Sequence, residues 1–132
     1  MMIMLDTNIC IHILKEHPEH IRQKFSEIDA VHISAIVYSE LAYGVENSPA
    51  RLQSARWKQL RAFLARLAIH SWDEQAAEAY GRIRTHLRKN GTMIGNMDLL
   101  IAAHALSLNA TLITNNTREF GRIPRLNLEN WY

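Results

Sequence analysis

Short apolar runs alternate along the chain with longer segments of helical spacing. The first run, Met2 to Leu5, ends at Asp6-Thr7-Asn8 and is followed by the apolar stretch Ile9 to Leu14. A short apolar run that ends in helix-capping residues predicts a buried strand leading into a helix. We therefore expect Asp6 at the C-terminal end of a strand.

The same alternation continues to the C-terminus. It predicts, in chain order, a helix over Glu19–Ile28, a strand over Val31–Ser34, a helix over Ala35–Val45, a helical pattern over Pro49–Ala68, a strand over Ala68–Trp72, a helix from Asp73 to near Gly91, a helix over Met97–Leu108, a strand over Thr111–Thr114, a polar turn over Asn115–Arg118 and a strand near Leu126–Leu128. The segment from Met97 is apolar nearly all round, which is typical of a buried helix. Strands that alternate with helices predict an α/β fold with a central, mostly parallel sheet flanked by helices.

Length and composition agree with a globular domain. The chain has 132 residues, of which 48% are hydrophobic, so we expect a single domain over residues 1–132. One cysteine, Cys10, excludes a disulfide scaffold. Because no apolar run is long enough to span a membrane and no signal peptide is recognisable, a cytoplasmic protein without membrane contact is expected.

The formal net charge of +2 conceals two basic stretches that contain no acid. Five basic residues lie between Asn47 and Trp72, and four more lie between Gly81 and Met97: Arg51, Arg56, Lys58, Arg61 and Arg66, then Arg82, Arg84, Arg88 and Lys89. Runs of this kind are most often solvated helix faces, and the alternative is a surface that binds nucleic acid.

Acidic residues stand where the predicted strands end or the next helices begin. Asp6 follows the first strand, Glu40 lies in the helix after the second, and Asp98 begins the most apolar helix. Each has an ordinary structural explanation as a cap, a first-turn acid or a solvated side chain. However, Asp6 and Asp98 adjoin buried segments with no Lys or Arg beside them, and buried carboxylates need a charge partner. Oxygen ligands favour Mg²⁺ or Mn²⁺ over zinc, for which the cysteine and histidines have no suitable spacing.

Other polar and aromatic residues have simpler interpretations. His104 follows Asp98 by six residues, which puts it on another face of the helix, so a hydrogen-bonded core histidine is favoured over a general base. Trp57, Trp72 and Trp131 are interpreted as packing residues rather than stacking platforms for bases.

Four segments together resemble the PIN-domain ribonucleases, and specifically the VapC toxins of type II VapBC toxin–antitoxin modules. The resemblance covers essentially the whole chain. It rests on Met2–Asn8, Ser34 with Ser39–Gly44, Ile94–Ala105 and Leu112–Phe120.

The resemblance implies a PIN-like domain that hydrolyses RNA phosphodiester bonds as a metal-dependent endoribonuclease. Asp6, Glu40 and Asp98 match three central acidic positions, with Asp6 and Asp98 binding the principal Mg²⁺ (or Mn²⁺) and Glu40 binding it or positioning water. The fourth position falls on Asn116, and Glu119 is the neighbouring carboxylate that can replace it. Further polar residues are expected to orient the carboxylates and waters: Thr7, Asn8, Ser34 and Thr114.

The resemblance also implies partners. A VapB-type antitoxin would neutralise the toxin by occupying a groove lined by the helices over Ile9–Leu14 and Ala35–Val45, and a homodimer inside a larger hetero-oligomer is expected. The RNA substrate would be tRNA, with the anticodon loop favoured, or rRNA, and its cleavage would inhibit translation. Its backbone is expected to contact the basic residues Arg51, Arg56, Lys58, Arg61, Arg82, Arg84, Arg88 and Lys89.

Two other functions compete with this interpretation. A phosphoacceptor receiver domain would require paired acids after the first strand and a lysine after a late strand, whereas Asp6 stands alone and Asn115 follows Thr114. A PIN domain that binds without cutting is supported only by Asn116.

Overall fold

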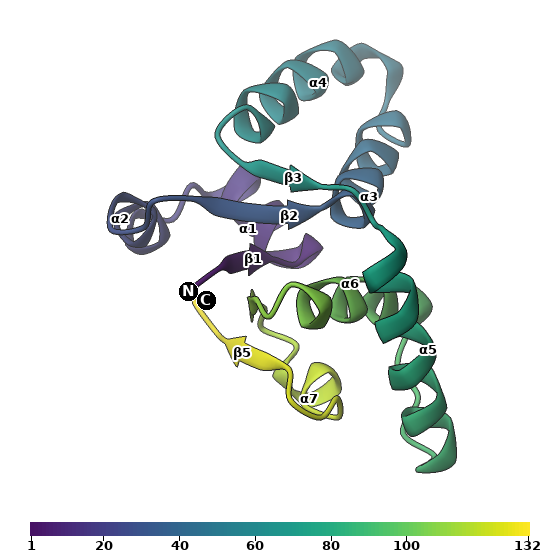
Figure 1. Ribbon diagram of the computed structural model, residues 1–132. Coiled ribbons are helices and arrows are strands. Elements are labelled where there is room, and N and C mark those ends of the chain that lie inside the picture. Colours follow the sequence, from purple (N-terminus) through teal and green to yellow (C-terminus); the bar gives the residue numbers. More distant parts are fainter.

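A five-stranded parallel sheet forms the centre of the computed structural model, which describes residues 1–132 (Figure 1). The strand order is β3-β2-β1-β4-β5, and every neighbouring pair is parallel. The strands are β1 (Ile3–Leu5), β2 (Val31–Ser34), β3 (Ala68–His70), β4 (Thr111–Ile113) and β5 (Asn127–Glu129). The predicted α/β fold with a central sheet and flanking helices is confirmed.

Seven helices connect and cover these strands. They are α1 (Thr7–Glu16), α2 (Glu19–Ser26), α3 (Ala35–Glu46), α4 (Ala50–Leu64), α5 (Glu74–Lys89), α6 (Asn96–Ser107) and α7 (Thr117–Phe120). Figure 1 shows α3 leaving the pointed end of β2, which is the end of the sheet where the acidic residues are expected.

Two predicted segments differ from the structure by more than about two residues at an end. The polar turn over Asn115–Arg118 is wrong in part, because the one-turn helix α7 begins at Thr117 and its buried Phe120 anchors it to the core. The helix predicted over Pro49–Ala68 ends at Leu64, where the backbone N–H groups of Arg66 and Leu67 donate to carbonyls three residues earlier. That tighter turn leads directly into β3.

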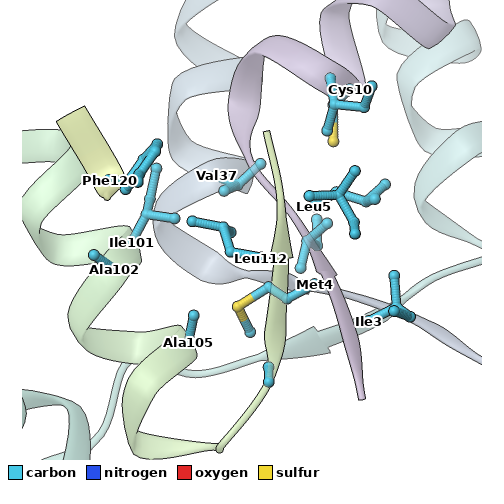
Figure 2. Packing of buried hydrophobic residues seen from close by; sticks show 14 of the residues in the cluster. Ile3, Met4, Leu5, Cys10, Val37, Ile101, Ala102, Ala105, Leu112 and Phe120 are labelled. Carbon is cyan, nitrogen blue, oxygen red and sulfur yellow. The ribbon is translucent and has the colours of Figure 1, made fainter. Parts of the chain in front are cut away.

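The central strand β1 divides the core into two layers. Its residues alternate, so that Ile3 and Leu5 lie on the side of α1 and Cys10, while Met4 lies with Leu112 on the side of α6 (Figure 2). All five of these side chains are almost completely buried. Burial on both faces explains why the strand is a continuous apolar run rather than an alternating one.

Helix α6 lies between the sheet and α5, as its apolar composition predicts. Ile101, Ala102 and Ala105 are buried, and Figure 2 shows them beside the sheet residues Met4 and Leu112. The opposite side of α6 packs extensively against α5. None of the helices combines the length and apolarity that crossing a membrane requires.

A Schellman motif at the end of α5 sets up this packing. Gly91 has a φ of 65°, its N–H donates to Arg88 O, and the N–H of Thr92 donates to Leu87 O at 2.9 Å. Only glycine adopts this left-handed conformation without strain. The motif ends α5 and turns the chain towards the start of α6.

Candidate active site

Asp6 is fixed where β1 becomes α1. Its Oδ1 accepts the N–H of Ile9 at 2.8 Å as the N-cap of α1, and its own N–H donates to Ile113 O in β4. The side chain is 3% exposed. Burial raises the pKa of Asp6, and the Glu40 charge adds to this, while the Thr114 hydroxyl and the Ile9 N–H act in the opposite direction.

Glu40 reaches the same region from α3. The hydroxyl of Thr7, in the first turn of α1, donates a hydrogen bond to its Oε1. This contact ties the middle of α3 to the residue that follows Asp6. Two of the polar residues expected to orient the carboxylates act on the central acids: the Thr7 hydroxyl donates to Glu40, and the Thr114 hydroxyl lowers the pKa of Asp6.

Asp98 stands in the first turn of α6 and is the most perturbed of these acids. Its pKa is raised to about 6, first by burial and then by the charges of Glu119, Glu40 and Asp6. Four carboxylates, from the end of β1 and from α3, α6 and α7, therefore share one electrostatic site.

The turn after β4 contributes Asn116 and Glu119. The Nδ2 of Asn116 donates to Glu119 Oε2 at 2.8 Å, and the N–H of Asn116 donates to Thr114 Oγ1 at 2.9 Å. Thr114 is completely buried and so anchors this turn. The two candidates for the fourth acidic position thus lie together, with Glu119 carrying the charge that acts on Asp98.

A hollow of about 660 Å³ opens over the central acids. Asp6, Glu40 and Asp98 line it, whereas Asn116 and Glu119 lie outside its lining. The other lining residues are Thr7, Asn8, Ile11, Ser39, Tyr43, Gly44 and Met97. The sequence prediction did not include the apolar rim of Ile11, Tyr43 and Met97, although Tyr43 follows Glu40 by three residues and so shares its helix face.

The charges of this site have no cationic partner within the chain. The one salt bridge in the structure joins Arg22 to Glu19 on the surface. No three His, Cys, Asp or Glu side chains converge closely enough to surround an ion. Mg²⁺ characteristically binds through one or two carboxylates and keeps several waters, so acids without a cationic partner in the chain fit a hydrated divalent cation.

Ser34 contacts the start of α3 and the buried His104 of α6. Its hydroxyl oxygen accepts the N–H of Ile36 at 3.0 Å as the N-cap of α3, and it lies 2.7 Å from Nδ1 of the buried His104. Capping and this contact occupy the side chain, and no carboxylate is among its partners. The interpretation of His104 as a hydrogen-bonded core histidine is confirmed.

The eight predicted RNA-binding residues are all exposed but lie on two helices that are well separated in Figure 1. Arg51, Arg56, Lys58 and Arg61 belong to α4, and Arg82, Arg84, Arg88 and Lys89 belong to α5. None lines the acidic hollow. Two have defined aromatic contacts: Arg61 lies over Trp57 and Arg84 lies over Tyr80.

Sequence and structure comparisons find relatives of the same family. Residues 3–126 match the PIN domain family. The chain is 45% identical to ribonuclease VapC2 of Rickettsia felis, covering 99% of this chain and 98% of the relative. It is 43% identical to the tRNA(fMet)-specific endonuclease VapC of Salmonella typhimurium, covering 97% of this chain and 96% of the relative. In the crystal structure of DNA-bound VapBC from Salmonella typhimurium, a chain of 41% identity superposes with a TM-score of 0.95, covering 100% of this chain and 99% of that one.

A parallel sheet in the order β3-β2-β1-β4-β5, with acids that lack a cationic partner at the end of β1 and in α3 and α6, is the architecture of a PIN-domain nuclease. Because the VapC relatives match nearly the full length of this chain, the family can be narrowed further. The chain belongs to the VapC ribonucleases of the PIN domain family.

Proposed function

We propose that this chain is the toxin of a type II toxin–antitoxin module, and that it cleaves RNA as a Mg²⁺-dependent endoribonuclease. The observation that carries the proposal is the group of carboxylates around Asp98, where burial and then the neighbouring charges raise the pKa of this residue and no cation of the chain balances them. PIN-domain nucleases are in general dependent on divalent metals, and an oxygen-only site favours Mg²⁺, with Mn²⁺ as a substitute.

Each acidic residue has a distinct role in this proposal. Asp6 and Asp98 hold the ion, while Glu40, oriented by the Thr7 hydroxyl, binds it or positions the attacking water. Glu119, held by Asn116, adds negative charge at the border of the site. A bound divalent cation neutralises the phosphate and lowers the pKa of water. With water as the nucleophile rather than the ribose 2′-OH, the products carry 5′-phosphate and 3′-hydroxyl ends.

We propose tRNA as the substrate class, with the anticodon loop as the favoured target and rRNA as the alternative. The Salmonella relative of 43% identity is named for its specificity for tRNA(fMet). An acidic hollow repels the RNA backbone, so exposed arginines and lysines of α4 and α5 are required to hold it. Cleavage of this RNA inhibits translation.

A VapB-type antitoxin is the proposed partner, since the structural neighbours from Rickettsia and Salmonella are VapBC complexes. An apolar groove of about 560 Å³ lies between α1, α2 and α4 and offers this partner a surface. Its apolar lining includes Ile13, Ile21, Phe25, Phe63 and Leu67. The sequence prediction places the antitoxin along the helices over Ile9–Leu14 and Ala35–Val45, and α1 and α3 together line the acidic hollow. We further propose that the toxin acts in the cytoplasm as one PIN domain and forms a homodimer within the complex.

The test is cleavage of purified tRNA by the isolated protein, with the Asp6→Asn variant as control. Asparagine keeps an oxygen that can cap α1, so the variant removes the charge and retains the helix start. We expect wild-type cleavage in Mg²⁺, none in EDTA, and loss of at least about a hundredfold in rate for the variant. Wild-type-like cleavage by Asp6→Asn together with insensitivity to EDTA would contradict the proposal.

A further inference from the structure

A chain of side-chain contacts connects α5 to the first residue of α6. The hydroxyl of Tyr80 donates to Asn96 Oδ1 at 3.1 Å and accepts a hydrogen bond from Arg84 Nη1 at 3.1 Å. The Arg84 guanidinium also lies 5.8 Å from the centroid of the Tyr80 ring. Trp72 packs edge-on against that ring at 6.1 Å, and its Nε1 donates to Leu100 O of α6. Tyr80 is therefore held on both sides, and it holds Arg84 in turn.

This chain of contacts ends beside the acidic hollow. Asn96 precedes Asp98 by two residues in the first turn of α6, and Met97 between them lines the hollow. Arg84 lies two hydrogen bonds from the Asn96 side chain. Among the basic residues of the chain, Arg84 is thus the one that side-chain contacts connect to the helix of Asp98.

Helix geometry separates Arg84 from the other basic residues of α5. The buried stripe of this helix is Ala76, Ala79, Ile83 and Leu87. Arg84 follows Tyr80 by four residues and lies on the same flank of that stripe, whereas Arg82 and Lys89 lie on the opposite flank. Arg82 is therefore a charge-matched comparison on the same helix.

The partners of Arg84 leave its charge available. Both of its contacts are with the neutral side chain of Tyr80, and no carboxylate forms a salt bridge with it. The Nδ2 donors of Asn96 also have no partner, because Tyr80 occupies Oδ1 alone. A fixed guanidinium with free donors matches the oxygens of a phosphate, which it can bind in bidentate fashion.

We propose that Arg84, oriented by Tyr80, binds a backbone phosphate of the RNA next to the scissile one, with the Asn96 amide as a second donor. The inference rests on the proposed ribonuclease function. An acidic site repels its own substrate, and a cation connected through Tyr80 to the start of α6 offsets this without neutralising Asp98 directly.

The experiment compares wild type, Arg84→Ala, Arg84→Lys, Tyr80→Phe and Arg82→Ala on a fluorescently labelled tRNA anticodon stem-loop. We expect Arg84→Ala to raise KM roughly tenfold with less than about a twofold change in kcat, and Arg84→Lys to restore part of the loss. Tyr80→Phe, which keeps the ring and removes the hydroxyl, is expected to raise KM about threefold. Arg82→Ala is expected to raise KM less than Arg84→Ala does.

Binding of the same RNA is measured separately in EDTA, where cleavage does not interfere. Loss of Arg84 is expected to reduce the slope of log K against log salt by about 0.7, the value for one phosphate contact with a single strand. This measurement reports on Arg84 even if the wild type does not cleave, which would instead contradict the proposed function. Equal effects of Arg82→Ala and Arg84→Ala, or a lower thermal stability of Arg84→Ala with unchanged KM and salt slope, would overturn the inference.

Discussion

The side-chain amide of Asn116 donates a hydrogen bond to the carboxylate of Glu119 at 2.8 Å. The two residues that compete in sequence for the fourth acidic position are therefore one structural unit. Asn116 supplies no charge, but it orients the neighbouring acid, and the Glu119 charge is the largest electrostatic contribution to the raised pKa of Asp98 after burial. An asparagine at this position does not by itself indicate an inactive site.

The Glu119→Gln variant tests this relationship. Removing the charge should lower the pKa of Asp98 from about 6 towards its ordinary value, because one of the carboxylates that disfavour its ionisation is gone. The measurement is a carbon NMR titration of the Asp98 carboxyl in EDTA. Asn116→Ala is the matched control, since it retains the Glu119 charge and should leave the pKa raised. An unchanged titration in Glu119→Gln would contradict the account.

The pH dependence of stability follows from the same carboxyl group. Because the pKa of Asp98 is about 6 in the folded protein and 3.8 is its ordinary value, the folded state holds a proton that the unfolded chain has already lost. The contribution of this group to the free energy of unfolding therefore falls as pH rises from about 4 to 6. After allowance for screening, the expected loss is about 1 to 2 kcal/mol.

Urea unfolding in EDTA at pH 4 and pH 7.5 measures this loss. Asp98→Asn should be more stable than wild type at pH 7.5 and should lack this component of the pH dependence. Addition of Mg²⁺ at pH 7.5 should stabilise wild type more than the variant, because the cation binds the folded state. A variant that is less stable than wild type at pH 7.5 in EDTA would show that Asp98 has a stabilising partner instead.

The hydroxyl of Thr7 is predicted to position Glu40. Thr7→Val keeps the β-branched shape and removes the hydrogen bond to Oε1, so cleavage should slow roughly three- to tenfold, in line with about 1 kcal/mol for one such bond. Thr7→Ser keeps the hydroxyl and serves as the control. The comparison uses kcat with Mg²⁺ and RNA at saturation. Equal kcat values for Thr7→Val and Thr7→Ser would show that the Thr7 hydroxyl does not position Glu40.

Ser34 is predicted to act on stability rather than on catalysis. Ser34→Ala removes the N-cap of α3 and leaves Nδ1 of the buried His104 without its partner, which should cost about 1 to 3 kcal/mol of unfolding free energy. At a temperature well below the unfolding transition, the folded variant should retain most of the wild-type kcat. A large fall in kcat with unchanged stability would instead support the expectation from the sequence that Ser34 orients the carboxylates or waters of the site.

The fold was predictable because its signals are local. The run Met2 to Leu5 is apolar without alternation since both faces of β1 are buried, and Asp6 marks its end because it caps α1. The short helix α7 was not predictable, since its four residues are polar apart from Phe120, and burial of that one ring decides its position.

The candidate site was predictable in its acids and much less so in its supporting contacts. Strand ends and helix starts carry Asp6 and Asp98, which places them near one another in any parallel sheet. By contrast, Thr7 and Glu40 are 33 residues apart, and Ser34 and His104 are 70 apart. Such partners depend on how helices pack, which periodicity along one segment does not encode.

The central claim is that the carboxylates of Asp6 and Asp98 hold the divalent cation that RNA cleavage requires. Its most direct test is the single-turnover rate of cleavage of a tRNA anticodon stem-loop at pH 7.5, measured for wild type and Asp98→Asn as Mg²⁺ is titrated. The account predicts a rate that rises with Mg²⁺ and saturates for wild type, and a variant at least about a hundredfold slower at every concentration. Equal rates for the two proteins, or a wild-type rate independent of Mg²⁺ in the presence of EDTA, would contradict it.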